Sequence, residues 1–201
     1  KREDIVKNYK DSAGLKAREL KSEIEELDKR IKKLLNIKLY SDIYQKNKLV
    51  EEDFEQINPF HWGFEFYDIF NGEDNVSDIG FDVIVGNPPY GNLLSEIEKK
   101  AIFDYKTKDA SEIAANFIER SIKLTKDKGF IGFIIANSIA INKSTSSARD
   151  LIRQNIPISK MALFGTRPSK IFADAEIRVL IFLGEKSKSD KYGVIYTTDA
   201  I

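Results

Sequence analysis

The sequence contains no cysteine and a single histidine, His61. These absences exclude a disulfide framework, a thiolate nucleophile and a zinc site built from cysteine and histidine, and we predict no metal site. A cysteine-free chain also fits a reducing compartment, so we expect a cytoplasmic protein. Lysine plus arginine and aspartate plus glutamate both number 32. Without net charge the chain as a whole attracts neither nucleic acid nor an anionic membrane, and any basic surface must be local.

Long apolar runs are absent as well. The longest, residues 130–136 and 177–183, fall far short of the about 18 residues that a membrane-spanning helix needs, so we expect no membrane segment. The 201 residues are 42% hydrophobic and 32% charged, which is typical of a globular chain with a substantial core. From its two ends, Lys1 and Ile201, we expect a section of a larger protein.

Residues 1–58 are predicted to form a helical arm or insertion. Residues 1–40 hold 12 basic and 8 acidic side chains, and apolar residues recur among them at steps of four and three, the spacing of a narrow helical stripe. The stripe consists of Leu20, Ile24, Leu27, Ile31 and Leu34. We predict a helix from a cap at Ser12 to about Leu35. It is interpreted as a solvated arm or half of a helical hairpin; a partner-binding coiled coil and a DNA contact are the alternatives.

Residues 59–201 show the pattern of an α/β fold, in which strand-like and helical segments alternate around a parallel or mixed sheet. Strands are predicted at residues 81–86, 130–136, 160–164 and 176–183, and helices at 111–124 and 146–155. In the first of these helices, Ile113, Phe117 and Ile122 are expected to face the core. The second part of the chain is therefore the one expected to hold a packed core.

The loop after the first predicted strand is the most informative segment. Phe81–Gly86 runs directly into Asn87-Pro88-Pro89-Tyr90, and in an open α/β sheet ligands bind beyond the carboxyl ends of strands. The Asn87 side chain and a fixed backbone carbonyl offer two acceptors to one planar amino group, and Tyr90 offers a flat face to a base or amide. A proline-stiffened turn with a buried tyrosine is the structural alternative.

This loop resembles the catalytic motif of the amino-group methyltransferases. The same four residues after such a strand are shared by DNA adenine-N6, protein glutamine and some RNA guanine methyltransferases, so the flanking segments must decide among them. Residues 60–70 are similar to the Phe-x-Trp-x-x-Glu-Phe-Pro-Glu-Val-Phe segment of the large methyltransferases of restriction-modification systems. Tyr67 and Asp68 depart from the proline and glutamate of that segment.

Two downstream segments resemble the same group. Residues 112–138 are similar to the helix and strand that follow its catalytic loop, with Ala136 where the family usually has proline. Residues 170–183 resemble a late motif in which Phe172 fills the aromatic position. The sequence thus resembles the type IIG, Eco57I-like N6-adenine DNA methyltransferases, and the helical arm resembles an insertion of that subgroup.

The resemblance implies the second half of a Rossmann-like class I methyltransferase sheet with an N-terminal helical, coiled-coil-like appendage. It implies methyl transfer from S-adenosylmethionine to a flipped adenine of double-stranded DNA, with Asn87, Pro88 and Tyr90 as catalytic residues. Tyr90 and Phe172 are expected to stack on the base, and Pro89 to border the cofactor. The remainder of a parent restriction-modification enzyme is the second expected partner.

The main donor-binding motif of such domains is missing from the sequence. A glycine-rich loop follows their first strand, but no Gly-x-Gly pair occurs here and no apolar strand precedes residue 50. We therefore expect the donor site upstream in the parent, and an inactive isolated section. The basic residues expected to touch DNA phosphates are Arg149, Arg153, Arg167 and Lys170.

Two other functions compete with this interpretation. A protein glutamine N5 methyltransferase suits the same acceptors, but residues 60–70 and Phe172 favour the DNA enzymes. A non-catalytic helical binding module on a partial methyltransferase fold is opposed by the intact loop. His61 is expected to pack or hydrogen-bond among its aromatic neighbours, and Asp82 to have no catalytic role.

Overall fold

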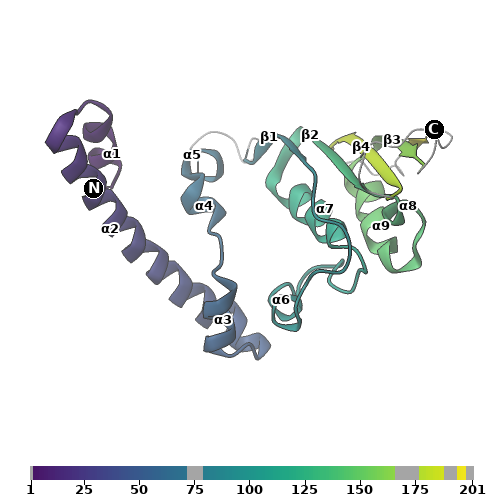
Figure 1. The fold of residues 1–201 in the computed structure, drawn as a ribbon, viewed down its shortest axis with the longest axis horizontal. Helices are drawn as coiled ribbons and strands as arrows, with labels where there is room; N and C mark the ends of the chain where they lie inside the picture. Colours follow the sequence, from purple (N-terminus) through teal and green to yellow (C-terminus); the bar gives the residue numbers. More distant parts are fainter. Residues whose placement is uncertain (1, 72–78, 166–176, 188–193, 198–201) are drawn as a thin grey trace. The chain divides into compact units, whose positions relative to one another are not determined.

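The computed structural model describes residues 2–71, 79–165, 177–187 and 194–197. The chain divides into two compact units, Lys1–His61 and Trp62–Ile201, whereas the sequence predicted a boundary after residue 58. Figure 1 shows the helices of the first unit and the sheet of the second. No helix among the described residues is long and apolar enough to cross a membrane.

The first unit, which we call the helical unit, consists of helices joined by short turns. They are α1 (Arg2–Lys10), α2 (Gly14–Leu39), a π-helical turn (Tyr40–Tyr44), a 3-10 turn (Gln45–Asn47) and α3 (Glu51–Ile57). The prediction that Ser12 caps the long helix is wrong, because Ala13 holds that position. The Ser12 hydroxyl instead donates to the backbone oxygen of Asn8 at 2.5 Å, and so satisfies a carbonyl at the end of α1.

Packing in the helical unit is confined to its two ends. At one end, α1 lies against α2, where Arg2 Nε donates to Asp28 Oδ1 at 2.6 Å and Ile5 is buried. At the other end, the buried ring of Phe54 lies 5.4 Å from the ring of Tyr40 and 5.2 Å from that of Tyr44, centroid to centroid. Within α2, which is described throughout, no residue is fully buried.

The second unit, the sheet unit, is built on a mixed sheet in which the described strands follow the order β1-β2-β4-β3-β5. Strands β1 (Phe81–Gly86) and β2 (Thr125–Ala136) are parallel. Strand β4 (Val179–Glu185) runs antiparallel between β2 and β3 (Ile158–Phe164), and β5 (Val194–Thr197) is parallel to β3. The helices are α4 (Trp62–Glu65), α5 (Tyr67–Phe70), α6 (Glu96–Ala101), α7 (Ile113–Leu124), α8 (Ser138–Ile141) and α9 (Ser146–Asn155). The predicted α/β class is confirmed.

The core lies between one face of this sheet and helices α7 and α9. Its side chains include Ile118, Ile122, Ile131, Phe133, Ile135, Leu151, Ile152, Met161, Leu180 and Phe182. Because side chains alternate along a strand, the remaining residues point to the opposite face. There Val83, Val85, Phe130 and Leu183 are each more than half exposed.

The prediction that Phe117 faces the core is wrong, since its side chain is 42% exposed. The buried residues of α7 include Ala114, Ile118 and Ile122, so the buried arc is centred on a line that Phe117 flanks. Ile122 is confirmed as a core residue, and Ile113 is half-buried. Phe117 instead lines a cleft beside the Asn87–Tyr90 loop.

Candidate functional site

The Asn87–Tyr90 loop leaves the carboxyl end of β1. Because β1 and β2 are parallel, with Gly86 opposite Phe133, the segments that follow the two strands lie at the same edge of the sheet. Within the loop, Pro88 is buried, Asn87 and Pro89 are exposed, and Tyr90 is half-buried. The loop therefore offers the Asn87 side chain to solvent from a base that is anchored in the protein.

A cleft of about 590 Å³ lies along β1 and reaches this loop. Residues 83–89 form one wall, and Phe117, Arg120 and Leu124 of α7 form another, with Trp62 completing the lining. Apolar and aromatic walls beside a few convergent polar groups are typical of a site for a small or planar ligand.

Tyr90 and Asn87 contact each other directly. The Tyr90 hydroxyl donates a hydrogen bond of 2.9 Å to the side-chain oxygen Oδ1 of Asn87. Partial burial raises the pKa of Tyr90 above its ordinary value of 10.0, so this hydroxyl stays protonated and remains a donor at neutral pH. The bond fixes the direction of the Asn87 oxygen, which keeps a second lone pair for an incoming amino group.

A sharp turn follows Tyr90. Gly91 has a φ of +96°, a conformation that favours glycine. Its N–H donates to Glu112 Oε2 at 2.8 Å, and the N–H of Ile113 donates to the Gly91 carbonyl at 2.9 Å. Glu112 Oε1 in turn accepts from Ser138 Oγ at 2.8 Å. The turn is thus bound to the start of α7 and, through one carboxylate, to the segment after β2.

A second carboxylate holds the segment that precedes α7. Glu119 is 3% exposed, and its Oε2 accepts from the backbone N–H of Thr107 at 3.0 Å and from its hydroxyl at 2.9 Å. Asn116 donates to the Thr107 carbonyl at 2.9 Å, and Lys123 pairs with Glu119 at 3.1 Å. Sequence reasoning missed Glu112 and Glu119; acidic residues at the start and on the buried side of an otherwise apolar helix were the available signal.

The aromatic segment at residues 60–70 supports the opposite end of β1. Trp62, Phe66 and Phe70 each meet the ring of Phe81 edge-on, at centroid distances of 6.0, 5.0 and 5.3 Å. The guanidinium of Arg120 lies 5.5 Å from the Trp62 ring centroid, a cation–π contact. This segment therefore anchors the first residue of the strand that ends at Asn87.

The predicted DNA contacts lie in different surroundings. Arg149 Nη1 donates to the carbonyls of Ile139 and Asn142, each at 2.8 Å, and so holds the turn between α8 and α9. Arg153 is half exposed and pairs with Asp150. A DNA contact by either arginine stays a prediction. Arg167, Lys170 and Phe172 lie outside the described residues.

Two other predicted residues have structural partners. His61 Nε2 lies 2.6 Å from Asn36 Oδ1, a hydrogen bond within the helical unit. Asp82 pairs with Lys126 at 2.5 Å, and this ammonium group lowers the pKa of Asp82 below its usual 3.8. No cluster of three or more potential metal ligands of the His, Cys, Asp or Glu type occurs among the residues that the structure describes.

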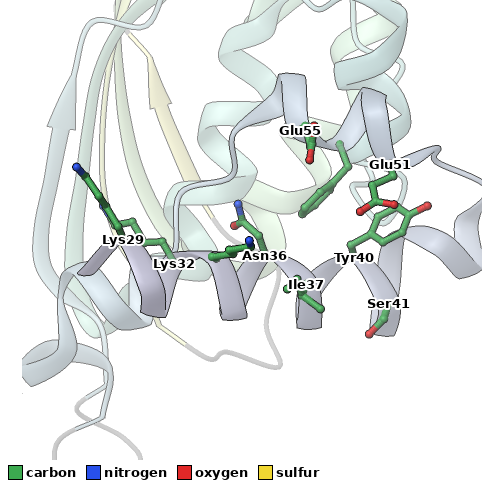
Figure 2. A pocket seen from close by; sticks show the side chains of 10 residues that line it. Lys29, Lys32, Asn36, Ile37, Tyr40, Ser41, Glu51 and Glu55 are labelled. Atoms are coloured by element: carbon green, nitrogen blue, oxygen red, sulfur yellow. The ribbon is translucent and has the colours of Figure 1, made fainter. Parts of the chain in front are cut away.

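The helical unit carries a cavity of its own, a groove of about 730 Å³ between α2 and α3. Figure 2 shows Lys29 and Lys32 toward one end of the groove and Glu51 beside Tyr40 toward the other. Charges of both signs line it, so its electrostatics select neither an anionic nor a cationic ligand.

Comparison with known proteins identifies the class as a methyltransferase of restriction-modification systems. Residues 6–172 match the profile of the family described as Eco57I restriction-modification methylase. The chain belongs to this family, as its loop and flanking segments predict.

Two relatives carry related descriptions. A candidate type II restriction enzyme and methyltransferase of Methanocaldococcus jannaschii, RM.MjaORFECS2P, is 35% identical over 94% of this chain. The type II restriction enzyme and methyltransferase RM.Eco57I of Escherichia coli is 26% identical over 76% of it. The matches cover 16% and 14% of those proteins, so the chain spans about a sixth of their length. Among solved structures, a candidate class I S-adenosylmethionine-dependent methyltransferase of Listeria monocytogenes aligns with a TM-score of 0.48 at 17% identity, over 60% of this chain and 37% of that one.

Proposed function

We propose that this chain forms the amine-accepting half of a DNA adenine-N6 methyltransferase within a longer, cytoplasmic restriction-modification enzyme. The observation that carries the proposal is the loop at the end of β1, where Asn87 Oδ1 is oriented by the Tyr90 hydroxyl at 2.9 Å. Membership of a restriction-modification methylase family supports DNA as the substrate.

The chemistry follows from the needs of the exocyclic amine of adenine. Its lone pair is delocalised into the ring, so the nitrogen is a poor nucleophile. Asn87 Oδ1 and the Pro88 carbonyl accept the two amino hydrogens and favour a pyramidal nitrogen whose lone pair attacks the methyl carbon in line. The proton is lost as the N–C bond forms, and no general base has to act first.

The target base must leave the duplex to reach this loop. Flipping costs a few kcal/mol, and stacking on an aromatic face offsets part of that cost. We assign one face to Tyr90, whose ring is half-buried beside Asn87, and the other to Phe172.

S-adenosylmethionine is the proposed methyl donor and supplies the methyl group from its sulfonium. The residues in hand fit only the border of its site, where Pro89 is exposed beside the cleft along β1. Since the sequence has no Gly-x-Gly pair, we assign the rest of the donor site to other segments of the whole protein.

The test is Asn87→Ala in the whole protein that carries this chain. Methyl transfer to adenine in duplex DNA should fall by at least about 100-fold, because one of two fixed acceptors is lost. DNA affinity should stay within about threefold, since phosphate contacts dominate it. The matched control is Asn142→Ala, which changes an exposed asparagine outside the loop. Activity that survives in Asn87→Ala contradicts the proposal, and methylation of glutamine in a protein substrate would assign the alternative function.

A further inference from the structure

We propose that Glu112 is a positioning residue for the Asn87–Tyr90 loop. Its carboxylate joins Gly91, which follows the loop, to Ser138, which follows β2, and so sets where Tyr90 and Asn87 stand relative to the sheet. The role in catalysis rests on the proposed function, whereas the tie itself rests on the fold alone.

The hydrogen bonds around Glu112 use both of its oxygens. Oε2 accepts from the Gly91 N–H and Oε1 accepts from Ser138 Oγ, each at 2.8 Å. The Ile113 N–H returns a bond of 2.9 Å to the Gly91 carbonyl. Gly91 is therefore held through both its N–H and its C=O, by two consecutive residues of one chain segment.

Gly91 is the point at which such a hold has the greatest effect. With a φ of +96° it lies in a region of backbone space open to glycine, where alternative conformations cost little. Pro88 and Pro89 restrict the chain before Tyr90, but they donate no backbone hydrogen bond that would fix its direction. The Glu112 carboxylate supplies the missing restraint on the far side of Tyr90.

Ser138 makes the support rigid. It begins α8, and the Thr145 hydroxyl donates to its carbonyl at 3.0 Å. Arg149 Nη1 donates to Thr145 Oγ1 at 3.0 Å and to the Ile139 carbonyl at 2.8 Å. Glu112 thus connects the loop after β1 to a hydrogen-bonded turn after β2, and through it to α9.

Hydrogen-bond geometry, rather than charge, is the proposed function of this carboxylate, and two variants separate them. In Glu112→Gln the amide oxygen still accepts from Gly91, and the amide nitrogen donates to the Ser138 hydroxyl, which is also an acceptor. In Glu112→Ala both bonds are lost. Glu96→Ala is the matched control, since Glu96 is an exposed glutamate of α6 that pairs with Lys99.

The first measurement is amide hydrogen exchange in the whole protein, which does not depend on activity. The Gly91 amide should exchange at least about tenfold faster in Glu112→Ala, and within about threefold of the wild-type rate in Glu112→Gln and Glu96→Ala. An unchanged Gly91 rate in Glu112→Ala overturns the proposal. If Glu112→Ala does not fold, Ser138→Ala, which removes the support alone, should raise the rate about two- to fivefold, and no rise there overturns it equally.

The second measurement is steady-state methyl transfer. We expect kcat to fall at least about tenfold in Glu112→Ala, with KM for DNA within about threefold, because misplacement of reacting groups affects the chemical step more than binding. Glu112→Gln should retain at least about a third of kcat. Equal damage in both variants would assign the effect to charge and refute the positioning role. If the wild type transfers no methyl group to adenine, the proposed function fails, and the exchange result still decides the tie.

Discussion

In the helical unit, the buried apolar side chains among the described residues are Ile5, Leu49 and Phe54, whereas the sheet unit buries rows of them from three strands and two helices. The long helix α2 has a stripe of apolar residues yet no buried one. Apolar burial is the main source of folding free energy, so the two units must differ in how they are stabilised. The contrast teaches that an apolar pattern in a sequence reports a helix but does not report whether a partner covers it.

The largest expected effect is in the sheet core. Phe182 is 0% exposed at the centre of the core, and Phe182→Ala removes a large side chain that neighbours cannot replace. We expect a loss of about 3–5 kcal/mol in the free energy of unfolding. Urea denaturation followed by tryptophan fluorescence measures it, since Trp62 lies in this unit. A loss below about 1 kcal/mol would break the comparison.

A smaller effect is expected from the aromatic contact of the helical unit. Phe54→Ala removes the ring that packs on Tyr40 and Tyr44, and should cost about 2–4 kcal/mol within that unit. Leu34→Ala is the control, because Leu34 is 67% exposed and its change should stay within about 0.5 kcal/mol. Loss of helical circular dichroism on heating reports both variants. If Leu34→Ala proves as damaging as Phe54→Ala, the stripe of α2 has a partner in solution.

Tyr90 tests whether the chemistry of the site is separable from the stability of the core. Tyr90→Phe keeps the ring but loses the bond to Asn87, so kcat should fall by about two- to tenfold. Tyr90→Ala also removes the stacking face, worth a further about 1–3 kcal/mol. Because the pKa of Tyr90 is raised, the ratio of wild-type to Tyr90→Phe activity should be constant from about pH 6 to 9. A ratio that changes within that range would show that the hydroxyl ionises there.

The smallest expected effect concerns the ion pair of Asp82 and Lys126. The hydrogen bond and charge of Lys126 lower the pKa of Asp82 in the folded state, so the pair stabilises the fold above the unfolded value of 3.8 and loses this effect as the pH falls through the lower folded value. Asp82→Asn should therefore lower Tm slightly near neutral pH and not in strong acid. The Asp82 side chain is 80% exposed, so added salt should also abolish the difference.

Much of the sheet unit could be predicted because local pattern and final structure agree. The segments 81–86 and 146–155 form β1 and α9 with the predicted bounds. The last long strand was placed too early, at 176–183 instead of Val179–Glu185, since its apolar run does not mark where pairing with β2 and β3 begins. Phe117 was misplaced for a related reason, because small alanines define the buried arc of α7 and carry little hydrophobic signal.

The site was predictable only in part. Its loop, Asn87–Tyr90, follows from the motif and from the strand before it. The supporting carboxylates Glu112 and Glu119 contact partners that are 21 and 12 residues away, Gly91 and Thr107, and no local pattern links those positions. Contacts between distant backbone and side-chain groups depend on the tertiary fold, which composition and periodicity do not encode.

The order of strands has a consequence for how the protein is made. Strand β4 lies between β2 and β3 although it follows both in the chain, and Phe182 of β4 pairs with Phe133 of β2. A ribosome therefore releases β1, β2 and β3 before the strand that joins β2 to β3 emerges. Until then, the facing edges of those two strands stay open and their apolar side chains lack a partner, which exposes the nascent chain to aggregation and to chaperones. Translation of β4 is the event that closes the sheet.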